Sequence, residues 1–209
     1  IADVSHYIPA NSEIDKEASL RAFSVYFPGL VIPMIPEKLS NEICSLNPNE
    51  DKLCFSVVVK IDPRSYAVKS HWVGKTIINS NKRFTYNEAE KIIVENIQSE
   101  FGSEITILDS IAKHLRKNRI KNGSIDFERR ETSFMLNNDN EPIEVVDKPA
   151  LSTHKLVEEF MLLANKIVAQ KLSKKLFSIY RVHDLPNKEK ITDLINYLSQ
   201  LKLKNINLR

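Results

Sequence analysis

Residues 152–171 constrain the fold more than any other segment of this sequence. Apolar side chains recur along it at helical spacing and occupy most sides of the helix that this spacing predicts. They are Leu156, Val157, Phe160, Met161, Leu163, Ala164, Ile167 and Val168. A helix that is apolar on most sides has to be covered by other parts of a domain. The sequence therefore predicts one long buried helix.

Antiparallel strands are predicted earlier in the chain. Residues 53–61 alternate and favour β-branched types, residues 62–65 are typical of a turn, and residues 66–78 can return as a second strand. Shorter strands are predicted around 125–127, 132–136 and 143–146, and further helices over 14–21, 85–96, 105–119 and 188–203. We therefore expect an α+β fold, with a mixed or antiparallel sheet packed against helices, in a single domain over residues 1–209.

The chain begins with Ile1-Ala2-Asp3-Val4-Ser5-His6-Tyr7, a run that is typical of a buried strand entering a turn. An apolar strand needs neighbours to satisfy its backbone groups, so we expect this chain to be part of a larger protein. Asp3 lies at the predicted strand end, where a carboxylate can bind or support a metal ion. A turn-forming hydrogen-bond acceptor would explain the same residue.

Between this start and residue 53, the segment 22–41 combines prolines with apolar residues. A polar linker would lack those apolar side chains, so the segment predicts an ordered, partly buried loop. The two cysteines, Cys44 and Cys54, lie in apolar surroundings that indicate buried free thiols. The histidines and cysteines lack zinc-ligand spacing, and no apolar run is long enough to cross a bilayer.

Several residues suit binding to a nucleic acid. Tyr86 follows Lys82 and Arg83 at a predicted helix start, where a ring can stack on a base while cations hold phosphate. Alternatively, Phe84 belongs to the core and Tyr86 packs at the helix entry. Basic residues also cluster over 113–121 and after residue 165. A solvated helix face also explains these clusters and, from charge alone, explains them better.

Two further pairs of charged or titratable side chains are expected to bind groups of opposite charge. Arg181 and His183 would point to the same side of a strand and could hold a phosphate, although a surface loop explains them too. The pair Glu158-Glu159 falls within the predicted long helix, where a buried carboxylate requires a cation. We expect that cation to be one such as Arg21 or Arg181, unless these carboxylates help to coordinate another group.

Seven segments, in order, resemble the catalytic (RNB) domain of the ribonuclease II/ribonuclease R family of exoribonucleases. Together they cover nearly the whole chain, and the matches within the first fifty residues are the most specific. The segments are 1–7 (IADVSHY), 24–28 (SVYFP), 31–37 (VIPMIPE), 39–48 (LSNEICSLNP), 84–86 (FTY), 158–165 (EEFMLLAN) and 181–186 (RVHDLP).

The resemblance implies a processive hydrolase that degrades RNA from its 3′ end to nucleoside 5′-monophosphates, with Mg²⁺ as cofactor. It implies single-stranded RNA as partner, neither DNA nor a membrane, and a location in the bacterial cytoplasm. By position, it makes Tyr86 a base-stacking residue in the RNA channel. It also places Arg181 and His183 along that channel, near the RNA 3′ end.

The family's metal-binding aspartates would precede Ile1, and its arginine-rich motif and catalytic glutamate would follow Arg209. We therefore expect a chain that is truncated at both ends, has no complete catalytic site and is inactive alone. Asp3 becomes the residue nearest to that site, supporting the metal ligands from behind. The alternative is a non-catalytic RNA-binding or scaffold relative with the same fold.

Overall fold

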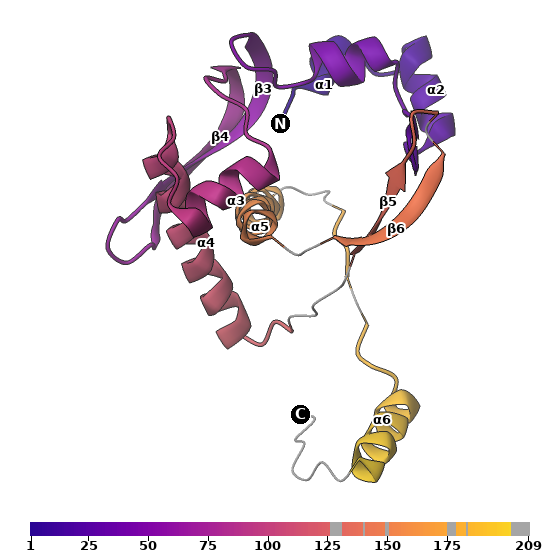
Figure 1. The fold of residues 1–209 in the computed structure, drawn as a ribbon, viewed down its shortest axis with the longest axis vertical. Coiled ribbons are helices and arrows are strands. Elements are labelled where there is room, and N and C mark those ends of the chain that lie inside the picture. Colours follow the sequence, from indigo (N-terminus) through magenta and orange to yellow (C-terminus); the bar gives the residue numbers. More distant parts are fainter. Residues whose placement is uncertain (126–130, 140, 149–150, 175–178, 183, 202–209) are drawn as a thin grey trace. The chain divides into compact units, whose positions relative to one another are not determined.

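The computed structural model describes residues 1–209 except 126–130, 140, 149–150, 175–178, 183 and 202–209. Two compact units, Ile1–Lys171 and Leu172–Arg209, are described separately. The described part of the first unit combines helices with two-stranded antiparallel sheets (Figure 1). This arrangement confirms the predicted α+β class. The single domain over residues 1–209 stays a prediction.

The predicted long hairpin is present. Strand β3 (Asp51–Ile61) pairs with strand β4 (Val68–Asn79) in antiparallel register. The side chain of Asp62 fixes the turn, because one carboxylate oxygen accepts hydrogen bonds from the amides of Arg64 and Ser65, both at 2.9 Å. An aspartate that bonds to amides two and three residues ahead is a common device for reversing the chain.

The first residues pair with the edge of β3 and then form a short helix. Ala2 bridges Cys54, and the amide of Asp3 donates to the carbonyl of Leu53 at 2.9 Å. Helix α1 (Val4–Tyr7) begins immediately afterwards. The predicted strand that ends at Asp3 is thus a single bridge, and the predicted turn after it forms as a helical turn that satisfies its backbone groups locally. The predicted burial is wrong for Ile1, which is 87% exposed.

The proline-rich segment is more regular and more exposed than its sequence predicts. Strands β1 (Val25–Phe27) and β2 (Leu30–Ile32) form a hairpin around Gly29, whose φ of 73° suits a glycine, and a π-helical segment η1 (Lys38–Ile43) follows. The predicted partial burial is wrong for most of the hairpin, because a two-stranded ribbon covers neither of its own faces. Its exposed apolar side chains are Tyr26, Phe27, Leu30, Val31 and Ile32.

Two helices begin at the caps that the sequence indicates. Helix α2 (Glu13–Arg21) starts after Ser12, whose hydroxyl accepts a hydrogen bond from the amide of Asp15 at 3.3 Å. Helix α3 (Tyr86–Glu95) starts after Thr85. Each side chain satisfies an amide that has no partner within its helix, which fixes the helix start.

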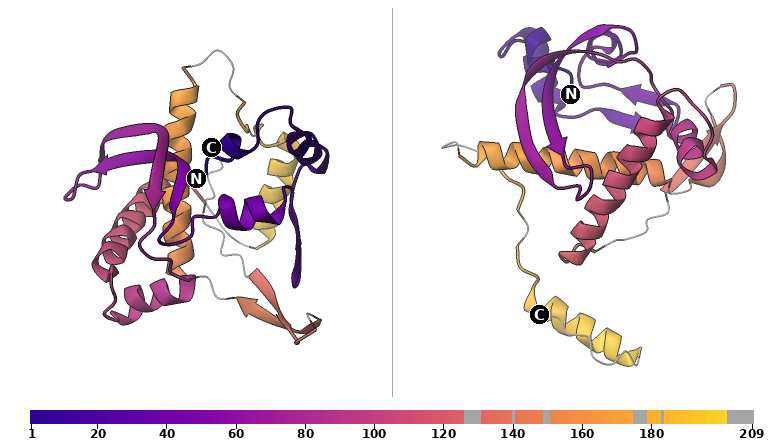
Figure 2. Two further views of the ribbon diagram at one scale, coloured as in Figure 1. Left: turned by 90° about the horizontal axis from the view of Figure 1, so that it is seen from above. Right: turned by 90° about the vertical axis from the view of Figure 1, so that its left-hand side faces the viewer.

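Helices α4 (Gly102–Lys121) and α5 (Ser152–Leu172) complete the helical part of the first unit, and the right-hand view of Figure 2 shows α4 crossing α5 at an angle. The predicted long helix is thus present as α5. Its cover is incomplete, since Val157 and Met161 are 46% and 55% exposed. Its buried residues are Thr153, Glu159 and Ile167.

The buried apolar residues of the first unit lie on the long hairpin and on helices α3, α4 and α5. They are Cys54, Val73, Ile92, Ile111, Ala112 and Ile167. At the end of α5, the ammonium of Lys171 donates to the carbonyl of Val73 at 3.0 Å. Cys54 and Cys44 are free thiols, as predicted, although Cys44 is only half-buried.

The remaining elements follow the predicted order. Strands β5 (Glu131–Leu136) and β6 (Pro142–Lys148) form the later hairpin, whereas the strand predicted at 125–127 falls mostly outside the described residues. In the second unit, α6 (Lys188–Gln200) is capped by Asn187, which accepts from the amide two residues ahead at 2.8 Å. Among the described helices, none has the length and apolar character needed to cross a membrane.

Candidate nucleic-acid interface

Tyr86 is the first residue of α3, and a reciprocal capping box fixes it there. The hydroxyl of Thr85 accepts from the amide of Glu88 at 3.2 Å, and the Glu88 carboxylate accepts from the amide of Thr85 at 2.7 Å. These two bonds satisfy backbone groups that a helix start leaves open. The position of Tyr86 therefore follows from the local sequence.

The N-terminus of α5 supports the Tyr86 side chain. The ring of His154 meets the Tyr86 ring edge-on, with 4.3 Å between centroids, and the hydroxyl of Thr153 donates to the Tyr86 carbonyl at 3.2 Å. The Tyr86 side chain remains 48% exposed. A half-exposed ring that is braced from behind has the arrangement required for stacking on a base.

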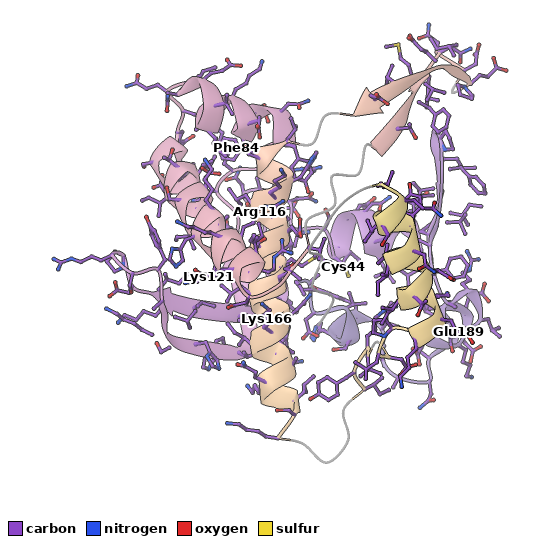
Figure 3. The ribbon with its side chains drawn as sticks, turned by 90° about the horizontal axis from the view of Figure 1, so that it is seen from below. Cys44, Phe84, Arg116, Lys121, Lys166 and Glu189 are labelled. Atoms are coloured by element: carbon purple, nitrogen blue, oxygen red, sulfur yellow. The ribbon has the colours of Figure 1, made fainter. Side chains whose placement is uncertain are left out.

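The two cations that precede Tyr86 have different neighbours in the structure. Lys82 lies over the ring of half-buried Phe84, with 5.0 Å from its ammonium nitrogen to the centroid. Figure 3 labels Phe84 beside the junction of α3 and α5. Of the two cations predicted to accompany Tyr86, Lys82 thus contacts Phe84, while Arg83 lines a cavity with Tyr86.

This cavity lies among α3, α4 and α5 and has a volume of about 540 Å³. Its walls are mainly apolar, and Arg83 is the single cation among the residues that line it. They are Arg83, Phe84, Thr85, Tyr86, Ala89, Ile105, Leu108, Thr153, Leu156 and Val157. An apolar cavity with an aromatic ring and one cation can receive a flat ring attached to a phosphate.

Glu90, four residues after Tyr86, joins α3 to the start of α5. Its carboxylate accepts from the hydroxyl of Ser152 at 2.8 Å, and from the amides of Ser152 and Thr153 at 3.2 and 2.9 Å. Partial burial raises the pKa of Glu90, but these hydrogen bonds outweigh it and hold the pKa below its usual value. The sequence analysis missed this residue, although its helical spacing from Tyr86 places both on one side of α3.

A second link between helices involves the two glutamates of α5. The guanidinium of Arg119 donates to Glu159 at 2.6 and 3.0 Å and to Glu158 at 3.1 Å. Glu159 is 3% exposed, so its buried negative charge requires a cation such as this guanidinium close by. The cation predicted for this pair, Arg21 or Arg181, is in fact Arg119 on α4.

Asp3 is buried beside the long hairpin, and its predicted place near a metal site stays a prediction. Its carboxylate pairs with the ammonium of Lys75 at 2.8 Å and accepts from the hydroxyl of Ser5 at 2.6 Å. Lys75 and then Ser5 hold the pKa of Asp3 below its usual value. Within the part of the chain that the structure describes, no group of three or more His, Cys, Asp or Glu side chains could hold a metal ion. The described residues therefore do not fit a Mg²⁺ centre.

The other predicted site residues belong to the second unit. Arg181 is exposed and lies outside regular secondary structure, and His183 lies outside the described residues. Their placement along an RNA channel stays a prediction. In the first unit, the structure brings Tyr86 together with Arg83, His154 and the cavity.

The chain belongs to the RNB domain family, which matches residues 1–208. Ribonuclease R of Aquifex aeolicus is 37% identical over 98% of this chain and 30% of its own length. Ribonuclease R of Mycoplasmopsis pulmonis is 41% identical over 91% of this chain and 27% of its own length. This chain therefore spans less than a third of these curated relatives.

A solved structure agrees with this assignment. Mycoplasma genitalium RNase R in complex with ribose methylated single-stranded RNA aligns with 100% of this chain and 33% of that protein. The TM-score is 0.90 and the sequence identity is 30%. The fold assembled from β3, β4 and helices α3 to α5 is thus an RNB fold.

Proposed function

We propose that this chain forms part of a processive exoribonuclease that hydrolyses RNA from the 3′ end and releases nucleoside 5′-monophosphates. One observation carries the proposal: the whole chain aligns with an RNase R that was solved with single-stranded RNA. The relatives that are 37% and 41% identical are also ribonucleases. The expected location is the bacterial cytoplasm.

Within that enzyme, we assign RNA binding to the Tyr86 region. The exposed ring would stack on a base, and Arg83 at the rim of the cavity would attract the adjoining phosphate. Arg181 and His183 would contact the RNA backbone near its 3′ end, as the family resemblance implies. Stacking is tolerant of sequence, because every base has a flat face.

The proposed Mg²⁺ ions would need ligands beyond those that the described residues provide. Mg²⁺ would supply activation of water and stabilisation of the leaving oxygen. The Asp3 carboxylate already forms an ion pair with Lys75 and accepts a hydrogen bond from Ser5. Its proposed role is therefore to hold the start of the chain against the long hairpin. We therefore propose that residues 1–209 bind RNA but lack the complete catalytic centre.

The proposal is tested with the full-length protein that contains this chain. RNA labelled at its 5′ end is incubated with the protein and Mg²⁺, and products are separated by length over time. We expect a short labelled end product and nucleoside 5′-monophosphates, without a ladder of intermediates, and no cleavage of DNA of the same sequence. Internal cuts would contradict the exonuclease, and an inactive full-length protein would contradict it and favour the scaffold alternative.

Replacing Tyr86 with Ala in the full-length protein is expected to lengthen the end product, because the last bases lose their stacking partner. The dissociation constant for short single-stranded RNA should rise roughly 5- to 150-fold, the range expected for one stacked base. Gel analysis of end products and fluorescence anisotropy measure these two effects.

Tyr197→Ala provides the matched control, since Tyr197 is a more exposed tyrosine at 59% and lies on α6, outside the seven segments that resemble the family. The control should preserve both product length and affinity. Unchanged products from Tyr86→Ala would remove the stacking role from Tyr86.

A further inference from the structure

A second exposed aromatic ring lies on the long hairpin, outside the Tyr86 region. Trp72, the single tryptophan of the chain, is on β4 and is 51% exposed. Its ring occupies the space next to Gly74, where an added Cβ would lie 2.5 Å from Cζ2 and 2.6 Å from Cη2. Glycine at position 74 therefore lets the ring lie against the strand.

The strand register defines the surface around this ring. Val58, which is 55% exposed, is directly opposite Trp72, and Lys60 is opposite Ser70. Alternate residues of a strand share a face, so these four side chains belong to one face of the hairpin. We call this the Trp72 face; its members are Ser56, Val58, Lys60, Ser70, Trp72, Gly74 and Thr76. The hydroxyls of Ser56 and Thr76 are 2.6 Å apart, which agrees with a shared face.

The charge of the Trp72 face is complementary to phosphate. It contains Lys60, which is exposed, and its members include no carboxylate. Within the described residues, Lys60 has no ion-pair partner, whereas Lys69 and Lys75 on β4 pair with Asp62 and Asp3. An available cation next to a flat ring is the combination that holds a base and its phosphate.

We propose that the Trp72 face is a second stacking platform for single-stranded RNA. One base would stack on the open side of the Trp72 ring, with Val58 at its edge and Lys60 near the phosphate. A protein partner would favour a broader apolar surface, whereas one ring and one valine here are surrounded by hydroxyls and a lysine. The choice of RNA as ligand rests on the proposed function, but the geometry of the platform does not.

Because the chain has one tryptophan, its fluorescence reports directly on this face. A short oligoadenylate with a terminal dye is titrated with residues 1–209, and Trp72 emission and dye anisotropy are recorded together. We expect quenching of Trp72 that saturates with the anisotropy change. Lys60→Gln should reduce the slope of log affinity against log salt by about 0.7, the effect of one phosphate contact on a single strand.

Gly74→Ala is the sharpest variant, because it retains Trp72 but displaces its ring. We expect the dissociation constant to rise roughly tenfold, with loss of quenching, while circular dichroism stays unchanged. Trp72→Leu, followed by anisotropy alone, should weaken binding to a similar extent if Gly74→Ala fails to fold. Phe55→Ala is the matched control, since Phe55 is an exposed ring on the other face of the hairpin.

Binding that leaves Trp72 emission unchanged, or a Trp72→Leu variant that binds as tightly as the wild-type chain, would overturn the platform and leave the proposed function standing. A wild-type chain with no affinity for the oligoadenylate would also overturn the platform. Conversely, quenching by RNA together with an inactive full-length protein would overturn the proposed exonuclease and retain the platform.

Discussion

Replacing Arg119 with Ala is expected to destabilise the chain by about 3–5 kcal/mol, the cost of leaving a buried charge without its partner. The carboxylate of Glu159 is 3% exposed and accepts two hydrogen bonds from this guanidinium. The same side chain contacts Glu158 and the hydroxyl of Ser124. The variant would therefore loosen α4, α5 and the segment after α4 together.

Urea unfolding followed by circular dichroism measures this loss. Arg21→Ala is the matched control, because Arg21 forms an exposed pair with Glu17 and should cost less than about 1 kcal/mol. A double variant of Arg119 and Glu159 should recover part of the loss, since it removes the uncompensated charge. Equal costs for Arg119→Ala and Arg21→Ala would show that the link between the helices contributes little.

Replacing Glu90 with Ala is expected to destabilise the chain by about 2 kcal/mol. The Glu90 carboxylate caps α5 in place of a residue from that helix, and hydrogen bonds to a charged group contribute about 1.5–3 kcal/mol. Since α3 carries Tyr86 and α5 carries His154, this variant should also weaken RNA binding through lost support of the Tyr86 ring. Glu90→Gln, which retains one acceptor, should give an intermediate loss.

The effect of Glu90 should depend on pH. Its pKa is lower in the folded chain than its ordinary value of 4.5, so its stabilising contribution is present above that value. The contribution is lost as the pH falls through the folded pKa, and the wild-type and Glu90→Ala unfolding free energies should then converge. Glu95→Ala, an exposed glutamate of the same helix, is the control. A difference that stays constant from pH 7 to strongly acidic pH would contradict the capping role.

The elements predicted well from sequence are those with local determinants. Ser12 and Thr85 start α2 and α3 through bonds to amides three residues ahead, and both signals are visible in the sequence. The predicted burial of the first residues is wrong for Ile1, which is 87% exposed, because burial there depends on the pairing of Ala2 with a strand some fifty residues away. The predicted burial of the β1–β2 hairpin is wrong for a related reason. Whether a segment is buried depends on which other parts of the protein cover it.

The contrast between local signals and contacts made by distant segments also separates the predicted residues of the candidate site from the missed ones. Tyr86 combines an aromatic ring, nearby cations and a helix cap within five residues, so the local sequence is enough to predict it as a stacking residue, and that role stays a prediction. Arg119 and Glu159 are 40 positions apart, and Glu90 and Ser152 are 62 apart, so their contacts required the packed helices. Trp72 and Gly74 are close in sequence, but the fit of the ring over the glycine becomes visible only in the structure.

We propose that residues 1–209 hold RNA without a complete catalytic centre. The most direct test incubates this purified chain with 5′-labelled single-stranded RNA and Mg²⁺, with binding followed by anisotropy and integrity by gel. We expect saturable binding that weakens with salt and RNA that remains intact, while the full-length protein shortens the same RNA from its 3′ end. Mg²⁺-dependent shortening of the RNA by residues 1–209 alone would contradict this account.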